Sequence, residues 1–288
     1  MAASVYSPPG LRWARQTHDR RAAVATPVEN LGFVLTFVWH AIVAIPQAIG
    51  HYRTHTIRLI SDMTWGRGSL LVGGGTAPML ALLGAAMGAS LGVQAFSTLD
   101  MLGMGPVTGM ISAFANTREL APIAAGIGFA AQAGCRITAE IGSMRISEEI
   151  DALEALGIRS IPFAVTTRLV AGVVSLVPTF LIALILSYFA CATVIVVLHG
   201  QAEGVYGHYF DQFASGGDIM AAVLKIMVFG AAIVLIHCYY GYFASGGPEG
   251  VGRASGRAVR ASFVSIIALN MVLTVILWGA NSPVTFTG

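Results

Sequence analysis

The sequence predicts an all-α membrane protein, with five transmembrane helices and a further helical region at the amino terminus that lies in the membrane interface. Two features of composition favour this class. Charged residues make up only 10% of the 288 residues and hydrophobic residues make up 56%, whereas soluble domains carry about 25% charged residues. The third observation is a series of charge-free runs, each long enough to cross a bilayer.

The charge-free runs place the five crossings. A helix needs about 20 predominantly apolar residues to span the hydrocarbon core. A five-span domain is therefore expected over residues 68–288, and its second crossing should begin with an irregular or interfacial piece. The crossings are expected near 70–97, 106–142, 164–198, 219–243 and 261–280.

The amino-terminal part is predicted to stay at the membrane surface. Residues 1–30 read as a basic, mobile cytoplasmic tail. The apolar run that follows has only fifteen residues and stops at Pro46. Charged and histidine residues then interrupt the apolar ones as far as Trp65, which is typical of an amphipathic helix in the headgroup plane. We therefore expect an interfacial helical region over 31–67, with an apolar face formed by Ile57, Leu59, Ile60 and Met63.

The placement of basic residues predicts the orientation. With the amino terminus in the cytoplasm and five crossings, fourteen of the sixteen basic residues fall on the cytoplasmic side, in 1–67, 136–168 and 244–260. The outer loop 199–218 carries three acidic residues and no basic one. Because cytoplasmic loops are enriched in arginine and lysine, we expect a multi-pass protein of the inner (plasma) membrane, with its carboxyl terminus outside.

The inner loop SMRISEEIDALEALGIR, residues 143–159, predicts a short amphipathic helix at about 147–157. Its first turn is acidic, which suits a helix amino terminus, and Gly157 is placed to end it. Ile150, Leu153 and Leu156 form an apolar stripe. The simplest interpretation is an ordinary capped loop helix, but such a helix could also insert into a groove of a motor subunit.

Charged residues inside predicted spans are functional candidates. Arg136 and Glu140 are four residues apart and can pair on one helix face. Arg118 serves either as an anchor at the outer interface or in transport. Lys225 can either extend outward to the headgroups or contact the substrate directly. The candidates for intramembrane charge are Arg118, Glu119, Arg136, Glu140 and Lys225.

Three glycines repeat every four residues in the first span: Gly84, Gly88 and Gly92, called the glycine stripe below. Small residues at this spacing let helix backbones approach closely in lipid. The stripe therefore predicts either packing within the chain or a seam between subunits.

Several chemistries are absent from the sequence. There is no G-x-x-x-x-G-K-[ST] run, and Lys225 is the only lysine, so no P-loop binds a nucleotide here. No catalytic constellation or third metal ligand beside the histidines is evident, so we predict neither an enzyme nor a metal site. The net charge of +2 does not suggest a nucleic-acid partner.

Two runs resemble the signature of the MlaE/YrbE permeases, the membrane subunits of ABC transporters that move lipids with MCE proteins: RELAPIAA at 118–125 and AEIGSMRISEEIDALEALGI at 139–158. The run HCYYGYFASGGPEGVGRASGRAVR at 237–260 is similar to the actinobacterial YrbE branch, most like its B-type partner. The chain departs from the family at Gln132, where MlaE-like members have an arginine, and carries Arg136 one turn later.

The resemblance implies an MlaE-like ABC permease fold and a coupling helix that docks on the ATPase. It implies that the following residues lie on that helix: Ser147, Glu148, Glu149, Asp151, Ala152, Leu153 and Glu154. It further implies a pair of ABC ATPase subunits that hold the ATP and Mg²⁺, a second YrbE-type permease as heterodimer partner, and an MCE assembly on the outer side. The lipid, of the fatty acid, mycolic acid or sterol class, would lie between the first and fifth spans near the dimer axis.

Two functions remain open. The first is a non-catalytic permease subunit that couples ATP hydrolysis by a separate chain to lipid movement across the cell envelope. The alternative is an ion-coupled secondary carrier in which Glu119, Arg136 and Glu140 form a relay. A carrier of that kind is typically built from inverted repeats and broken helices, and no such symmetry is visible in five unequal spans.

Overall fold

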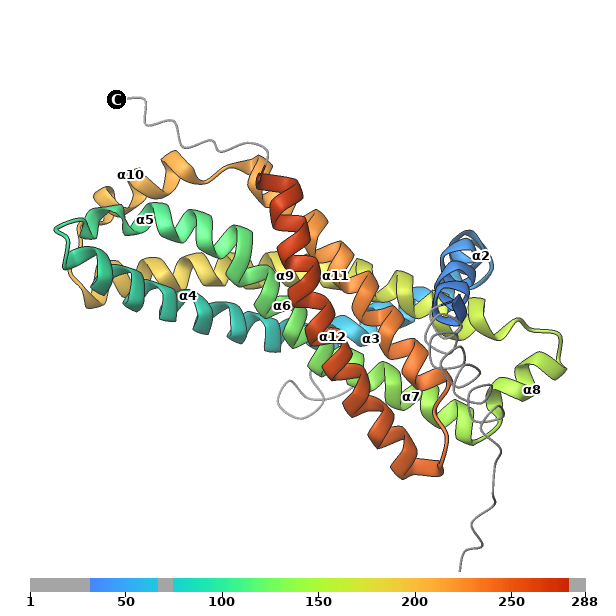
Figure 1. Ribbon diagram of the computed structural model, residues 1–288. Helices are drawn as coiled ribbons and strands as arrows, with labels where there is room; N and C mark the ends of the chain where they lie inside the picture. The colour runs from blue at the N-terminus through green and yellow to red at the C-terminus, as the bar shows by residue number, and fades with distance from the viewer. Residues whose placement is uncertain (1–31, 67–74, 280–288) are drawn as a thin grey trace, which may run out of the picture. The chain divides into compact units, whose positions relative to one another are not determined.

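The computed structural model describes residues 32–66 and 75–279 (Figure 1). The chain divides into two units, residues 1–43 and 44–288. In the first unit, the described residues 32–43 are helical. In the described ranges there is no β-strand, which confirms the all-α class. The predicted tail 1–30, residues 70–74 of the first predicted span and residue 280 of the last lie outside the described residues.

Six helices in the described ranges are long and apolar enough to cross a membrane: Gly32–His51, Thr76–Asp100, Gly105–Ile146, Ile161–Leu198, Gly216–Tyr242 and Gly247–Trp278. The protein is thus a multi-pass membrane protein. The last five correspond to the five predicted crossings. The first is an additional candidate, because the helix continues past the fifteen-residue apolar run to His51. Length and composition do not decide whether it crosses, and the count of five stays a prediction.

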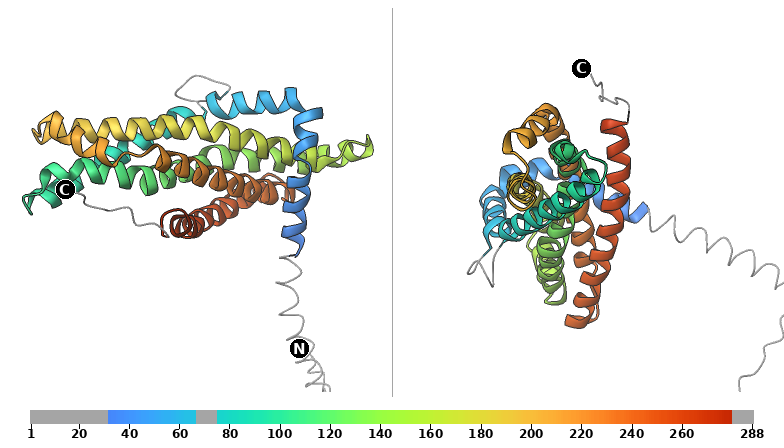
Figure 2. Two further views of the ribbon diagram at one scale, coloured as in Figure 1. Left: turned by 90° about the horizontal axis from the view of Figure 1, so that it is seen from above. Right: turned by 90° about the vertical axis from the view of Figure 1, so that its left-hand side faces the viewer.

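The second unit begins with two short helices that run in different directions. α2 (Ile45–His51) has Pro46 in its first turn and ends at Tyr52, where α3 (Arg53–Trp65) begins. In Figure 2, α2 runs across α9 (Thr167–Thr193), whereas α3 runs beside it. α2 and α3 therefore take different directions relative to the apolar helix α9.

α3 differs from the expected surface helix. Thr56, Leu59 and Met63 are buried, three and four residues apart on one face, while Ile57 is 62% exposed. The buried face is therefore rotated from the predicted one. The end of α3 is tied to the next helix, since Thr76 Oγ1 donates a hydrogen bond to the carbonyl oxygen of Met63 at 3.1 Å.

The glycine stripe lies on α4 (Thr76–Asp100) and packs within the chain, against α9. All three glycines are buried. A Cβ atom at Gly84 or Gly88 would overlap a backbone carbonyl oxygen of α9, and one at Gly92 would lie 3.2 Å from another. These oxygens belong to Ala183, Ser187 and Cys191. Each step of four residues along α4 is accompanied by a step of four residues in the same direction along α9, so the two helices run parallel to each other. While α9 covers the stripe, no face of these glycines is free to form a seam with another subunit.

The second crossing is a composite of helical pieces that together cover Gly105–Ile146. It begins with the expected irregular piece, a 3₁₀ turn, and contains two stretches of π-helix with wider turns. In order, the pieces are η1 (Gly105–Val107), α5 (Thr108–Ile111), η2 (Ser112–Leu120), α6 (Ala121–Phe129), η3 (Ala130–Gly134) and α7 (Cys135–Ile146). Stretches of π-helix occur frequently at functional sites, and the two charged residues at 118 and 119 lie in η2.

The remaining elements define two ends of the bundle. α8 (Glu149–Ala155) follows α7 at one end, and η4 (Ile161–Thr166), α9 and η5 (Val194–Leu198) lead to the other. There α10 (Glu203–Phe213), a helix within the predicted outer loop, precedes α11 (Gly216–Tyr242), which returns toward the end that carries α8 (Figure 1). These are called the α8 end and the α10 end below.

The last helix is much longer than the predicted crossing 261–280. α12 (Gly247–Trp278) begins fourteen residues earlier, directly after a turn at Gly246. The predicted inner segment 244–260 is therefore mostly helix and not loop. Arginine is a good helix former, and its charged side chain stays in solvent when the helix extends beyond the apolar part.

The contacts of the glycine stripe predict that alanine substitutions at Gly88 and Gly92 change the stability of the protein by different amounts. Replacing Gly88 by alanine should destabilise the protein by about 2 kcal/mol, because the new methyl group must push two backbones apart. Replacing Gly92 by alanine should cost much less, because its Cβ would lie 3.2 Å from Cys191 O, a contact that a shift of a few tenths of an ångström relieves, and because alanine favours the helix. Thermal unfolding of the two variants in detergent measures the difference, and equal melting temperatures would contradict the close packing.

Candidate functional site

α8 is a short helix that projects from the bundle, and a residue with positive φ stands on either side of it. Glu148, which precedes it, adopts a left-handed conformation with φ 59°, the only described non-glycine residue with positive φ. Gly157, with φ 77°, ends the turn that follows the helix. The helix is shorter than the predicted 147–157, and the predicted stop at Gly157 is present.

The carboxylates of α8 face solvent while one apolar residue anchors it. Ile150 is fully buried. The exposed acidic residues on and beside the helix are Glu148, Glu149, Asp151 and Glu154. Leu153 is half-buried and Leu156 is 77% exposed. The three residues of the predicted apolar stripe are therefore not buried together. Ile150 is buried, Leu153 is half-buried, and Leu156, which follows the last residue of the helix, is exposed.

Polar contacts fix the direction of α8. Arg145 Nη1 of α7 lies 2.8 Å from Asp151 Oδ1. Ser160 Oγ, at the start of η4, donates to Glu154 Oε1 at 2.5 Å and lies 2.8 Å from the hydroxyl of Tyr242 on α11. Ser147 Oγ donates to Glu149 Oε1 at 3.0 Å. The coupling candidates thus connect α7, η4 and α11, and Ala152 lies exposed on the helix between them.

A second group of polar residues lies between η2, α11 and α12, and we call it the Lys225 cluster. The side chain of Lys225 is fully buried. Its Nζ donates to the carbonyl oxygen of Arg118 at 2.6 Å and to Thr274 Oγ1 at 2.8 Å, and lies 3.3 Å from Glu119 Oε1. Glu119 also accepts hydrogen bonds from Asn270 Nδ2 at 2.6 Å and Thr274 Oγ1 at 2.7 Å. The sequence allowed Lys225 to extend to the headgroups, but the structure turns it inward.

Arg118 completes this cluster on the side nearer the α10 end. Its Nη2 donates to Asp218 Oδ2 at 2.8 Å, and Asp218 Oδ1 accepts a bond from Trp278 Nε1 at 2.7 Å. The guanidinium carbon lies 4.3 Å from the ring centroid of Phe114. Two cations and two carboxylates therefore balance, and they join the second crossing to α11 and α12. A buried charge is tolerated in a span when it is paired in this way.

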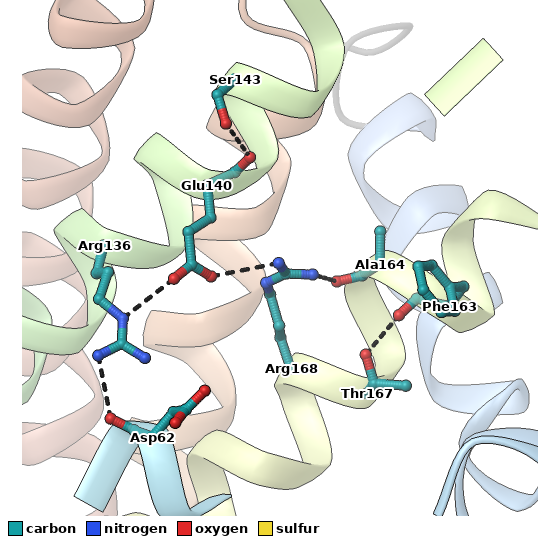
Figure 3. A network of polar contacts seen from close by, with 8 residues as sticks. All are labelled: Asp62, Arg136, Glu140, Ser143, Phe163, Ala164, Thr167 and Arg168. Carbon is teal, nitrogen blue, oxygen red and sulfur yellow. Dashed lines mark hydrogen bonds and ion pairs between the residues drawn. The ribbon is translucent and has the colours of Figure 1, made fainter. Parts of the chain in front are cut away.

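A third group, the Glu140 cluster, lies near the α8 end (Figure 3). Arg136 Nε lies 3.2 Å from Glu140 Oε1, which is the predicted pair within one helix. Glu140 Oε2 also lies 3.3 Å from Arg168 Nη2 on α9, and Arg136 Nη1 donates to the carbonyl oxygen of Asp62 on α3 at 3.0 Å. One carboxylate thus connects α7 with α9, and its arginine reaches α3.

His55 of α3 lies beside this cluster. Its ring stacks on Phe163 with centroids 4.9 Å apart. Burial, and after it the nearby charges of Arg168 and Arg58, lower the pKa of His55. The imidazole is therefore neutral at pH 7, and no third positive charge is added next to the arginines.

Sequence reasoning missed five partners of the candidate residues: Arg168, Asp218, Asn270, Thr274 and Trp278. In the sequence, Asp218 falls in the predicted outer loop, and Arg168 contributes to the predicted orientation only as a basic residue. The sequence of α12 does indicate a polar contact, because Asn270 and Thr274 stand four residues apart in an otherwise apolar stretch. That spacing places two polar groups on one helix face.

Gln132 lies exposed in η3, and Arg136 one turn later makes the contacts to Glu140 and Asp62. Among the described residues there is no group of three or more histidine, cysteine or acidic side chains placed to hold a metal ion.

The Lys225 cluster predicts a non-additive pair of mutations. Replacing Glu119 by glutamine removes the countercharge of the buried ammonium and should cost about 3 kcal/mol of stability. Replacing Lys225 by methionine in the same chain should recover most of that loss, because no unpaired charge then remains. Unfolding of both single variants and the double variant measures the coupling. Additive losses would show that the two charges do not stabilise each other.

Comparison with known proteins identifies the family. Residues 66–276 match the family described as Permease MlaE. A probable ABC transporter permease protein of Rickettsia bellii is 31% identical over 214 residues, which is 71% of this chain and 79% of the relative.

Two further relatives have more specific names. The intermembrane phospholipid transport system permease protein MlaE of Haemophilus influenzae is 28% identical over 252 residues, covering 87% of this chain and 91% of that protein. TRIGALACTOSYLDIACYLGLYCEROL 1, a chloroplastic protein of Arabidopsis thaliana, is 30% identical over 188 residues, covering 65% of this chain and 54% of that protein. Since the family match covers most of the chain and includes α8 and the ion-paired residues of both polar clusters, this protein belongs to the MlaE permease family.

Proposed function

We propose that this chain is the non-catalytic, membrane-spanning permease subunit of an ABC-type lipid transporter of the inner membrane. A pair of ATPase subunits, which hold the ATP and Mg²⁺, docks on α8 from the cytoplasm. Their movement changes access to an apolar space between this permease and a second one. An MCE assembly on the outer side exchanges the lipid.

The proposal rests on the exposed acidic surface of α8 and on its contacts with the rest of the bundle. α8 is an exposed acidic helix, anchored by the buried Ile150 and connected to α7, η4 and α11 by the contacts of Arg145 and Ser160. A partner that moves it therefore acts on three elements of the bundle at once. Insertion of a short helix into a groove is a recurring mode of docking between proteins.

A lipid cargo suits the surface of the bundle. Exposed large side chains on α12 are apolar over its second half: Val264, Ile267, Met271, Val272, Val275 and Ile276. Acyl chains and sterols bind to such surfaces, whereas ions and sugars need polar groups. The phospholipid system named for the Haemophilus relative supports the same class of cargo, and we place fatty acids, mycolic acids and sterols within it.

The partner permease is proposed to be a different chain. The stretch 237–260 resembles the B-type member of the actinobacterial YrbE pairs, which work as heterodimers. In this chain α9 covers the glycine stripe, so a seam between subunits would use other residues, such as the exposed apolar ones of α12.

The ion-coupled carrier is disfavoured by the separation of the charges. Glu119 belongs to the Lys225 cluster, whereas Arg136 and Glu140 belong to the cluster near the α8 end. Glu119 and Arg136 stand seventeen positions apart along one helical segment, or about 25 Å at the rise of an α-helix. The residues between them are apolar except for Gln132, so the three charged groups do not form a continuous relay.

Charge reversal on α8 should separate the ATPase from the membrane subunit. Replacing both Glu149 and Glu154 by lysine should leave the protein inserted and weaken co-purification of the ATPase by at least about tenfold, because like charges then meet the docking groove. The matched control reverses two exposed carboxylates at the opposite end, Glu203 and Asp211 of α10, and should retain the ATPase. Unchanged binding in the α8 variant would refute the coupling assignment.

The proposed orientation can be tested by labelling single cysteines in intact cells with a maleimide that does not cross membranes. A cysteine in place of Ala152 on α8 should react only after permeabilisation. A cysteine in place of Gly204 on α10, where the side chain has open space, should react at once. The unmodified chain, whose three cysteines are buried or half-buried, gives the background. The opposite pattern would place α8 outside the cell.

A further inference from the structure

The extended start of α12 forms one wall of a groove with a volume of about 480 Å³. We call it the basic groove, and it is lined by Ser245, Gly250, Arg253, Gly256, Arg257 and Arg260. The three arginines follow one another at steps of four and three residues, so they share one face of the helix. All three are exposed.

The arginines of the basic groove are largely unpaired. Arg253 Nη1 lies 3.7 Å from Glu249 Oε1, but both side chains are more than two-thirds exposed, and such pairs contribute little. The guanidinium of Arg257 lies 5.8 Å from the ring of Tyr240. Within the described residues, no carboxylate forms an ion pair with Arg257 or Arg260. The groove therefore presents positive charge that the described residues do not neutralise.

Two glycines shape the basic groove. A Cβ atom at Gly250 would overlap the carbonyl oxygen of Ser245, so glycine lets the preceding turn approach the helix. At Gly256 there is open space, with no atom within 4 Å of the Cβ position. The missing side chain at Gly256 thus leaves room among the guanidinium groups.

The position of the groove along α12 coincides with a change of surface from charged to apolar. On the same face, one turn and two turns after Arg260, stand Val264 and Ile267, which are 69% and 65% exposed. In a helix that crosses a membrane, this step from arginine to exposed aliphatic residues marks the boundary between headgroups and hydrocarbon. The arginines therefore stand at the depth of lipid phosphates.

We propose that the basic groove binds the phosphate headgroup of an anionic membrane lipid, as a site separate from the path of the transported lipid. Guanidinium groups match phosphate oxygens with paired hydrogen bonds, and basic pockets beside membrane helices are suited to anionic headgroups. An acidic protein partner fits the charge equally, but the adjoining exposed aliphatic face favours a ligand with acyl chains. The proposal goes beyond the transport function and does not require the bound lipid to be moved.

The test uses the full-length chain with the subunits that co-purify with it, stripped of lipid in detergent. Native mass spectrometry follows binding of dioleoylphosphatidylglycerol and of dioleoylphosphatidylcholine. Replacing Arg253, Arg257 and Arg260 together by glutamine should weaken phosphatidylglycerol binding by about tenfold or more and leave phosphatidylcholine binding unchanged. Gly256→Leu should give a similar loss without changing the charge, because its side chain fills the groove.

The matched control replaces three other exposed arginines by glutamine: Arg53, Arg58 and Arg159. It removes the same charge and should retain binding. Equal losses in both triple variants would show general attraction and overturn the proposal, as would unchanged binding in the groove variants. Loss of a co-purifying subunit with unchanged lipid binding would assign the groove to a protein. Displacement of the lipid by inorganic phosphate at equal concentration would assign it to a soluble anion.

Discussion

The absence of water between the apolar helices is the constraint on which this structure depends. Any polar group inside a span must find its partner on another helix, because lipid offers none. The ammonium of Lys225 meets this demand with a carboxylate, a hydroxyl and a backbone carbonyl from two other elements. These contacts determine which faces of α11 and α12 turn toward the second crossing. Apolar contacts alone would not determine how α11 and α12 are rotated about their own axes, since a leucine is as well solvated by lipid as by protein.

The same constraint explains the close approach of α4 and α9. Without a hydrophobic driving force between helices, association in lipid rests on van der Waals contact. The glycine stripe supplies this contact by bringing one backbone against the carbonyl oxygens of the other. α3 and α4 thus follow each other along α9, and α9 supports the chain on both sides of the undescribed residues 67–74.

Local features of the sequence predicted local features of the structure. The charge-free runs locate the apolar helices because hydrophobic length is a property of one segment. Arg136 and Glu140 pair as expected because both stand on one helix, and Gly157 closes the turn after α8 because glycine tolerates a left-handed backbone. Contacts between helices were not predictable in this way. Periodicity shows which face of α12 carries Asn270 and Thr274, but not that the facing residue is Glu119.

The two left-handed residues that enclose α8 have a mechanical consequence. A side chain beyond glycine resists this backbone conformation, so Glu148 occupies a narrow conformational well, and Gly157 closes the far corner with a backbone hydrogen bond to Glu154. Ile150, between these two residues, is buried in the core, so the short helix is held both at its ends and along its apolar side. A force that displaced α8 would therefore act on α7 and η4, the elements that precede and follow it in the chain.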